Sequence, residues 1–166
     1  MSDSLFEQPP NATPLGHDEL ANLRVPIVNR AQLNTLEANN VALGRRWAQR
    51  SRKDCFQPDF LTELHTRMFG EVWTWAGQYR LHEVNIGNTA PHQIEVAVHQ
   101  VFDDARAWIE YKSFGPAEIA IRLHHRLVLI HPFVNGNGRS TRLMADVAAK
   151  RLGLKPFTWG ADSLAE

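Results

Sequence analysis

Apolar side chains recur every three or four residues through most of the chain after residue 30. This spacing places them on one face of an α-helix. Pro58 and Pro116 stand where a first helical turn accepts proline, and Gly70 and Gly153 stand where helices commonly end. The pattern therefore predicts helices over residues 31–50, 59–69, 91–112, 116–130 and 139–152, with a short helical turn at 18–23.

The stretch between the second and third of these helices has a different pattern. Residues 81–86 alternate weakly, and Gly87-Asn88 follows them, a pair that favours a turn with positive φ. We therefore expect a small β-hairpin over residues 82–92, set into an otherwise all-α fold.

Proline content distinguishes the beginning of the chain from the rest. Pro9, Pro10 and Pro14 cannot donate backbone hydrogen bonds, and little apolar surface accompanies them. We expect a partly irregular arm over residues 1–30, a single domain over residues 31–155 and a C-terminal tail over residues 156–166.

Charge and cysteine content narrow the class of protein. The 166 residues carry 18 Lys and Arg against 18 Asp and Glu, a balance that argues against broad binding to nucleic acid or an anionic membrane. No apolar run approaches the ~20 residues that span a bilayer, and no basic stretch leading into an apolar one marks a secretory signal. The single cysteine, Cys55, excludes an internal disulfide. We expect a cytoplasmic protein without nucleic-acid or membrane partners.

The clearest chemistry lies in residues 131–142, His-Pro-Phe-Val-Asn-Gly-Asn-Gly-Arg-Ser-Thr-Arg. The pattern predicts a helix end, a glycine-containing loop and a helix start. A helix start offers unpaired N–H groups and partial positive charge to an anion, and Gly136 and Gly138 allow close approach of a phosphate. Arg139 and Arg142 are three residues apart on one helix face, where they could clamp a polyphosphate.

A histidine precedes this loop. His131 is placed to accept a proton from a hydroxyl next to the phosphate, so the segment indicates phosphoryl or nucleotidyl transfer. A plain glycine linker with surface arginines is the alternative, but it does not account for the histidine and both arginines together. A zinc site at His124 and His131 is disfavoured, because no carboxylate or thiol stands at matching spacing.

The same segment closely resembles the signature of the Fic family (filamentation induced by cyclic AMP), His-Pro-Phe-x-Asp/Glu-Gly-Asn-Gly-Arg-x-x-Arg. All the fixed positions match except position 135. Residues 68–80 resemble the family's segment before its hairpin, and residues 118–129 resemble the helix that leads into the motif. The Trp-Ala-Gly block at residues 75–77 together with the Asn-containing loop is similar to the subgroup called mobile mystery protein B.

This resemblance implies a Fic-type helical fold, with the hairpin as a flap beside the active-site loop. It also implies a protein adenylyltransferase, which moves AMP from ATP to a Ser, Thr or Tyr hydroxyl of a target protein and releases pyrophosphate. His131 would deprotonate the target hydroxyl. The nucleotide would be bound by Gly136, Asn137 and Gly138 at the α- and β-phosphates, by Arg139 at the β/γ end and by Arg142 at the γ-phosphate.

The one mismatch to the Fic signature, at position 135, concerns the metal ligand. Where the family usually has an acidic Mg²⁺ ligand, this chain has Asn135, whose amide oxygen can coordinate without the charge. Either the phosphates of ATP hold most of the Mg²⁺ and the site is weaker, or the protein binds nucleotide with little chemistry. We favour the first, because His131 and both arginines remain. Gly138 favours AMP transfer, since the family's death-on-curing kinases carry lysine there.

The resemblance also implies a docking element for the target. The family's flap pairs with the target backbone by β-augmentation, which assigns Val84, Asn85, Ile86 and Gly87 to target binding. A plain exposed hairpin explains each of these residues equally well.

An inhibitory glutamate is a further feature of many Fic proteins, where it pairs with the second arginine of the motif. Glu37, within Asn-Thr-Leu-Glu-Ala-Asn at residues 34–39, matches the inhibitory pattern in part. The hypothesis is a pair between Glu37 and Arg142, and an ordinary exposed helix glutamate is the commoner explanation.

Two other functions stay open at this stage. One is a Fic-type protein kinase, and the other is a non-catalytic or toxin-like nucleotide-binding module. The expected partner is a target protein with an exposed hydroxyl, and an antitoxin or another regulator is a second candidate partner.

Overall fold

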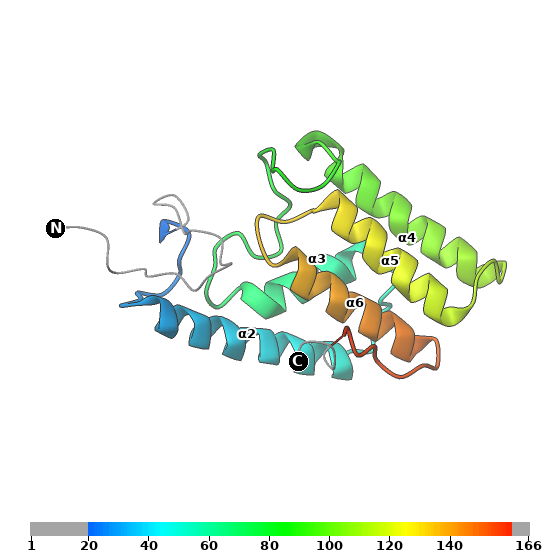
Figure 1. The fold of residues 1–166 in the computed structure, drawn as a ribbon, viewed down its shortest axis with the longest axis horizontal. Coiled ribbons are helices and arrows are strands. Elements are labelled where there is room, and N and C mark those ends of the chain that lie inside the picture. Colours follow the sequence, from blue (N-terminus) through cyan, green and yellow to red (C-terminus); the bar gives the residue numbers. More distant parts are fainter. Residues whose placement is uncertain (1–19, 161–166) are drawn as a thin grey trace. The chain divides into compact units, whose positions relative to one another are not determined.

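The computed structural model describes residues 20–160; residues 1–19 and 161–166, with most of the predicted arm, the start of the turn at 18–23 and the end of the tail, lie outside the described part. The described chain is helical, as the apolar spacing predicts (Figure 1). Its elements are α2 (Arg30–Arg50), α3 (Pro58–Phe69), the 3-10 helix η2 (Pro91–Gln93), α4 (Ile94–Glu110), α5 (Pro116–Ile130) and α6 (Asn137–Arg151).

Local signals explain where these helices begin and end. The Asn29 side chain accepts a hydrogen bond from the Gln32 N–H and caps α2, and Pro116 opens α5. Gly153 takes φ +85° just beyond α6. Most bounds lie within two residues of expectation: α6, for example, begins at Asn137 rather than 139, and α4 ends at Glu110 rather than 112. The first turn of the helix expected over 91–112 is the 3-10 helix η2, and α4 follows it.

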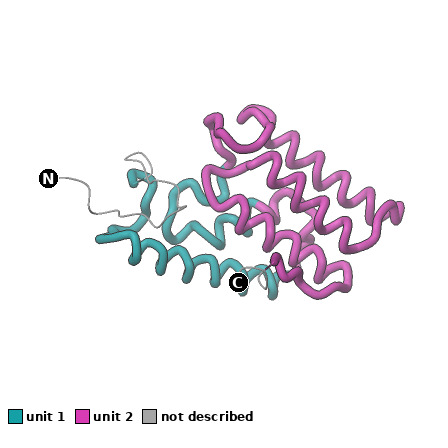
Figure 2. The backbone as a smooth tube through the Cα atoms, viewed as in Figure 1, with its two compact units in different colours: residues 1–51, 62–78 teal, residues 52–61, 79–166 magenta. Residues whose placement is uncertain are grey.

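The chain divides into two compact units (Figure 2). The first comprises residues 1–51 and 62–78. Within it, α2 and α3 approach closely at Gly44, where an added Cβ would lie 2.5 Å from the Met68 Cγ. Asn40 joins the same helices to the following turn, because its Nδ2 donates to the Arg67 carbonyl and its Oδ1 accepts from the Glu71 N–H.

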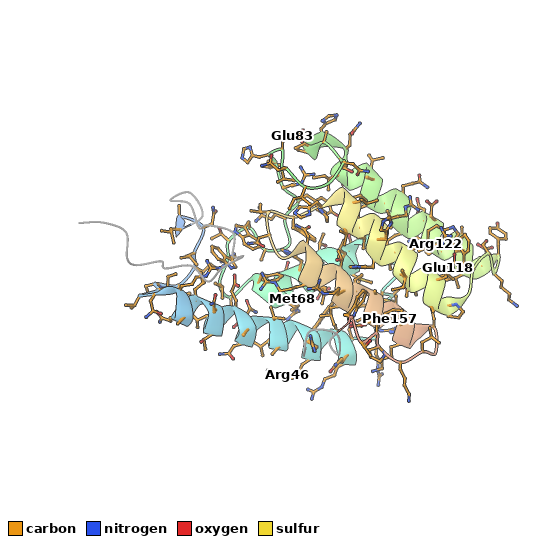
Figure 3. The ribbon with its side chains drawn as sticks, viewed as in Figure 1. Arg46, Met68, Glu83, Glu118, Arg122 and Phe157 are labelled. Carbon is orange, nitrogen blue, oxygen red and sulfur yellow. The ribbon has the colours of Figure 1, made fainter. Side chains whose placement is uncertain are left out.

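The second unit comprises residues 52–61 and 79–166 and contains α4, α5 and α6. Helix α5 packs against both α4 and α6, as Figure 1 shows. Its buried face carries the periodic apolar side chains, among them Leu123 and Leu127. On its exposed face Arg122 pairs with Glu118 at 2.7 Å, and Figure 3 shows these two side chains next to each other. This unit therefore positions the segment 131–142.

The predicted β-hairpin is wrong: residues 81–90 form bends without strands. Gly87 does take a positive φ, +97°. However, the carbonyls of His82 and Thr89 accept from Arg80, and the Asn88 N–H donates to the Leu129 carbonyl at 3.0 Å. The backbone of this segment is therefore bound to Arg80 and α5 rather than to itself, and a lone two-stranded hairpin without a buried face is marginal.

Across residues 20–160, no helix combines the length and apolar content that crossing a bilayer requires.

Candidate active site

The candidate site begins where α5 ends. His131 caps α5 in the left-handed conformation, with φ 51° and ψ 62°, and its N–H donates to the Leu127 carbonyl at 3.1 Å. A residue other than glycine there costs roughly 1–2 kcal/mol. Surrounding contacts must hold this conformation, which turns the chain sharply out of the helix.

Two residues outside the motif touch this turn. The Arg80 Nε donates to the His131 carbonyl at 2.6 Å, and the backbone N–H of Arg80 donates to the Pro132 carbonyl at 2.9 Å. Gly87 lies against the other side, since a Cβ on it would be 2.9 Å from the His131 Cβ and 2.9 Å from the Leu129 carbonyl oxygen. Residues of the segment 79–90 in the same unit thus contact the turn at His131.

The loop that follows is braced by Asn137. The Asn137 Oδ1 accepts from the Phe133 N–H at 2.9 Å, and its Nδ2 donates to the Phe133 carbonyl at 2.8 Å. Both side chains are buried, and the Phe133 ring packs on Tyr79 with 5.8 Å between ring centroids. The Asn137 side chain therefore fixes the shape of the loop, which leaves its backbone N–H as the group for an anion.

The start of α6 has the features of an anion site. Gly136 is its N-cap with φ 75°, and no side chain caps the helix. The Ser140 N–H donates to the Gly136 carbonyl at 2.9 Å, the first regular helical bond. The N–H groups of the first turn therefore point along the helix axis to where an anion would lie, and the helix dipole adds partial positive charge.

The motif arginines start from this first turn. Arg142 is exposed, and its Nη1 lies 3.4 Å from where a Gly138 Cβ would stand, so the guanidinium folds back toward the start of α6. Arg139, three residues earlier, is half-buried. The structure thus brings Arg142 to the glycine turn, and the absence of a side chain at Gly138 gives it room.

The electrostatic environment suits His131 to a neutral role. The imidazole is half-buried, and burial followed by the Arg80 charge lowers its pKa from the ordinary value. A neutral imidazole at pH 7 is able to accept a proton.

The predicted metal ligand has a partner inside the loop. The Asn135 Oδ1 accepts from the Gly136 N–H at 2.6 Å. An amide oxygen has a second lone pair, so Asn135 fits a single neutral ligand to Mg²⁺. Among residues 20–160 no group of three or more His, Cys, Asp or Glu side chains could hold a metal ion by itself.

The residues assigned to target binding are placed unevenly. Ile86 is 62% exposed and Asn85 is exposed, whereas Val84 is half-buried. Gly87 lies against His131, so it contacts the motif as well as belonging to the segment assigned to target binding. Leu81, 82% exposed, and Glu83, which Figure 3 shows on this segment, add further surface.

Glu37 lies in the first unit. Its Oε1 accepts from the Trp73 indole N–H at 2.6 Å, and the Trp73 ring is buried and stacked on Trp75. Glu37 is therefore more than an exposed helix glutamate. Its pairing with Arg142, which belongs to the second unit, stays a hypothesis.

Comparison with known proteins identifies the class. The sequence model described as the Fic/DOC family matches residues 55–149, which is more than half of the chain, so the chain belongs to the Fic/DOC family. The subgroup mobile mystery protein B stays a prediction.

A curated relative supports the same family. The protein adenylyltransferase fic-1 of Caenorhabditis elegans is 33% identical over 112 residues. The match covers 65% of this chain and 22% of that protein, so the chain spans less than a quarter of the relative's length.

Solved structures show the fold. The BepC protein of Bartonella tribocorum, with bound AMPPNP, is 18% identical with a TM-score of 0.65, over 83% of this chain and 80% of that one. The N-terminal Fic domain of a cell filamentation protein of Bartonella quintana, with bound ADP, is 19% identical with a TM-score of 0.64, over 79% and 72%. The all-helical Fic-type fold is thereby confirmed.

Sequence reasoning missed the part that Arg80 plays. The residue stands in an aromatic segment at positions 73–80 and is only 3% exposed. No local pattern marked Arg80 as a buried cation, because two of the carbonyls that it binds, those of Ile130 and His131, lie about fifty residues away in the sequence.

Proposed function

We propose that this chain transfers AMP from ATP to a hydroxyl group of a target protein, in the cytoplasm where ATP is available. The observation that carries the proposal is the loop between α5 and α6, which the two Asn137–Phe133 hydrogen bonds hold in shape. It joins a proton-accepting histidine to an uncapped helix start with Arg142 folded over it. The family relation to protein adenylyltransferases supports the same activity.

The geometry suggests how the residues divide the work. The N–H groups at the start of α6 would bind the α- and β-phosphates, and Arg139 and Arg142 would hold the β/γ end. Such binding fixes the triphosphate in one orientation, and phosphate transfer depends mainly on positioning and charge stabilisation. AMPPNP and ADP in the Bartonella structures make a nucleotide the reasonable ligand.

His131 would act on the target. Its neutral imidazole takes the proton from the target hydroxyl, whose oxygen attacks the α-phosphorus. The bond from that phosphorus to the oxygen bridging to the β-phosphate breaks, and pyrophosphate leaves. The new phosphoester joins AMP to the target, and the proton ends on His131.

Mg²⁺ would be held by the phosphate oxygens and by the second lone pair of the Asn135 amide. The ion supplies positive charge that neutralises the triphosphate when bound. With an amide rather than a carboxylate at position 135, this chain would depend more on its arginines and its helix start than on metal ligation.

The target would lie over segment 81–90. Leu81 and Ile86 expose apolar surface on the segment that contacts His131, so a polypeptide docked there would bring its hydroxyl to the base. Because the segment has no strand in the described structure, pairing with a target backbone requires it to extend on binding.

ATP labelled on the α- or the γ-phosphate tests the proposal. The full chain is incubated with host lysate, Mg²⁺ and each labelled ATP, and protein bands are counted. AMP transfer predicts label on protein from the α-position alone. His131→Ala should abolish the label while nucleotide affinity, measured by calorimetry, stays within about threefold of the parent.

The alternatives give different results. Label from the γ-position alone identifies a protein kinase and contradicts the proposal. Binding of ATP without any label identifies the nucleotide-binding module, for which an antitoxin or another regulator would be the partner. Arg142→Ala should lose ATP binding, whereas Arg122→Ala, which removes an exposed arginine of α5, should keep it. The two variants together separate binding at the site from a general effect of positive charge.

A further inference from the structure

Arg80 is a buried cation whose surroundings are unusual. It is 3% exposed, and in the described part of the chain its guanidinium makes all its hydrogen bonds with backbone carbonyl oxygens. A buried charge normally requires a partner of opposite sign, and removing compensation costs several kcal/mol. The contacts of Arg80 therefore must serve as that compensation.

The carbonyls belong to two segments. The Nε donates to the His131 carbonyl at 2.6 Å, and Nη2 donates to the Ile130 carbonyl at 3.2 Å. Nη1 donates to the His82 carbonyl at 2.9 Å, and Nη2 also donates to the Thr89 carbonyl at 2.6 Å. One planar group therefore joins the end of α5 to both ends of segment 82–89.

The end of α5 supplies the missing negative charge. The last carbonyls of a helix have no intrahelical partners and carry the negative end of its dipole. Ile130 and His131 provide two such carbonyls, and the rigid fork of arginine binds them while it also reaches two others. A lysine ammonium has neither the plane nor the number of donors for this arrangement.

The same contacts act on the turn at His131. Its left-handed backbone is strained, and the Arg80 bond to its carbonyl opposes relaxation. Gly87, carried by the segment that Arg80 fastens, closes against the His131 Cβ. Backbone and side chain of the histidine are both confined by elements that depend on Arg80.

We propose that Arg80 is a positioning residue for His131: its guanidinium fixes the left-handed turn at the end of α5 and fastens segment 81–90 to it, so that the imidazole is held in one orientation. The inference rests on the proposed function, because it assigns the purpose of the fixed histidine to AMP transfer. It predicts an effect on the chemical step rather than on ATP binding.

Arg80→Lys and Arg80→Met in the full chain test this. Misplacing a reacting group by about 1 Å costs on the order of 10²-fold, so both variants should lose at least about tenfold in kcat. The KM for ATP should change by less than about threefold, since the phosphate site is built on α6. Lys retains the positive charge, so its failure to rescue kcat distinguishes geometry from charge.

A second readout does not depend on activity. In NMR spectra of histidine-labelled protein, with His131→Ala used for assignment, the backbone shifts of His131 report its left-handed conformation. They should change in both Arg80 variants. The imidazole pKa should rise in Arg80→Met, because a nearby cation that lowers it is removed, and rise less in Arg80→Lys.

Arg106→Met is the matched control. Arg106 is a half-buried arginine of the second unit, and like Arg80 it donates to a backbone carbonyl, that of Phe56 at 2.6 Å. The Arg106→Met variant should lose thermal stability but keep the parent's kcat per folded molecule and the parent's NMR shifts of His131. Wild-type kcat in Arg80→Lys, or unchanged His131 shifts in both Arg80 variants, would overturn the inference. An inactive parent would contradict the proposed function alone, since the spectra still test Arg80.

Discussion

At the scale of single residues, we expect Asn135 to determine how much Mg²⁺ AMP transfer requires. Its Oδ1 accepts the Gly136 N–H, a role that an aspartate oxygen performs equally well. Asn135→Asp should keep the loop and add negative charge toward Mg²⁺, which lowers the Mg²⁺ concentration for half-maximal AMP transfer by about tenfold. The measurement is the rate of α-label transfer at fixed ATP and graded Mg²⁺.

Asn135→Ala is the control for that experiment, because it removes the acceptor and the ligand together. It should need more Mg²⁺ than the parent. An unchanged Mg²⁺ requirement in Asn135→Asp would contradict the assignment of Asn135 as a ligand.

The pH dependence of the proposed reaction should follow from His131. Burial and Arg80 lower the pKa of its imidazole in the folded protein, so the neutral form persists below the ordinary value of 6.5. The rate at saturating ATP should therefore hold as pH falls from 7 to 6.5 and decline only at lower pH. Rates measured against pH in buffers of constant ionic strength check this, and a decline already centred above 6.5 would contradict it.

At the scale of helices and turns, single glycines determine how closely one element approaches another. Gly77 has φ +78°, and an added Cβ would collide with the Thr66 hydroxyl of α3. Its N–H donates to the His65 Nδ1 at 2.9 Å, which ties the turn to the buried face of α3. Gly77→Ala should lower the free energy of unfolding by about 2–4 kcal/mol, from the clash and the left-handed backbone together.

Gly115 provides the matched control for Gly77. It has no positive φ, and a Cβ there would meet nothing within 4 Å. Gly115→Ala should change the free energy of unfolding by less than about 1 kcal/mol. Denaturant unfolding followed by tryptophan fluorescence measures both variants, and equal effects would show that the close approach of Gly77 is unimportant.

The segment after α6 is fixed through one carboxylate. The Asp146 Oδ1 accepts from the Phe157 N–H and from the Trp159 indole N–H, each at 3.0 Å. The Trp159 ring also lies 4.7 Å from the His124 ring. Trp159→Phe keeps an aromatic ring but loses a bond to a charged acceptor, so we expect a loss of about 1.5–3 kcal/mol of unfolding free energy.

Asp146→Asn tests the same contact from the other side. The amide oxygen still accepts both bonds, so the loss should be smaller than in Trp159→Phe. Thermal melts of the two variants measure both losses of stability. A Tm of Trp159→Phe equal to that of the parent would show that the indole hydrogen bond contributes nothing to stability.

At the scale of the whole molecule, the reactivity of Cys55 reports how often the second unit opens. It is buried, and burial raises the pKa of its thiol to about 12, so a thiol reagent should react only when the unit opens. Because the proposed ATP site lies in the same unit, ATP at 100 times its Kd should stabilise the closed state by about 2.7 kcal/mol and slow labelling about 100-fold. Labelling is followed by absorbance with and without Mg-ATP.

Arg142→Ala should label at the same rate with and without ATP, because it loses the nucleotide. ATP binding that leaves the labelling of the parent unchanged would place the nucleotide outside the second unit.

The sequence by itself determined the helices and carried the prediction of phosphate chemistry at the motif. Helical spacing of apolar residues is a local signal, and Pro116 and Gly153 mark helix ends without any distant partner. The segment 131–142 likewise holds a histidine, a glycine turn and two arginines within a short stretch, so residue types alone were enough to predict phosphate chemistry there.

Only the tertiary structure decided the shape of segment 81–90 and the conformation of His131. Weak alternation and Gly87-Asn88 predicted a hairpin, but the backbone groups of this segment bind Arg80 and Leu129 instead. One of these hydrogen bonds, between Asn88 and Leu129, joins residues about forty positions apart, and no local pattern encodes it. The physical reason is that a buried cation takes the nearest carbonyls that the fold presents, and which carbonyls those are depends on how the chain is packed.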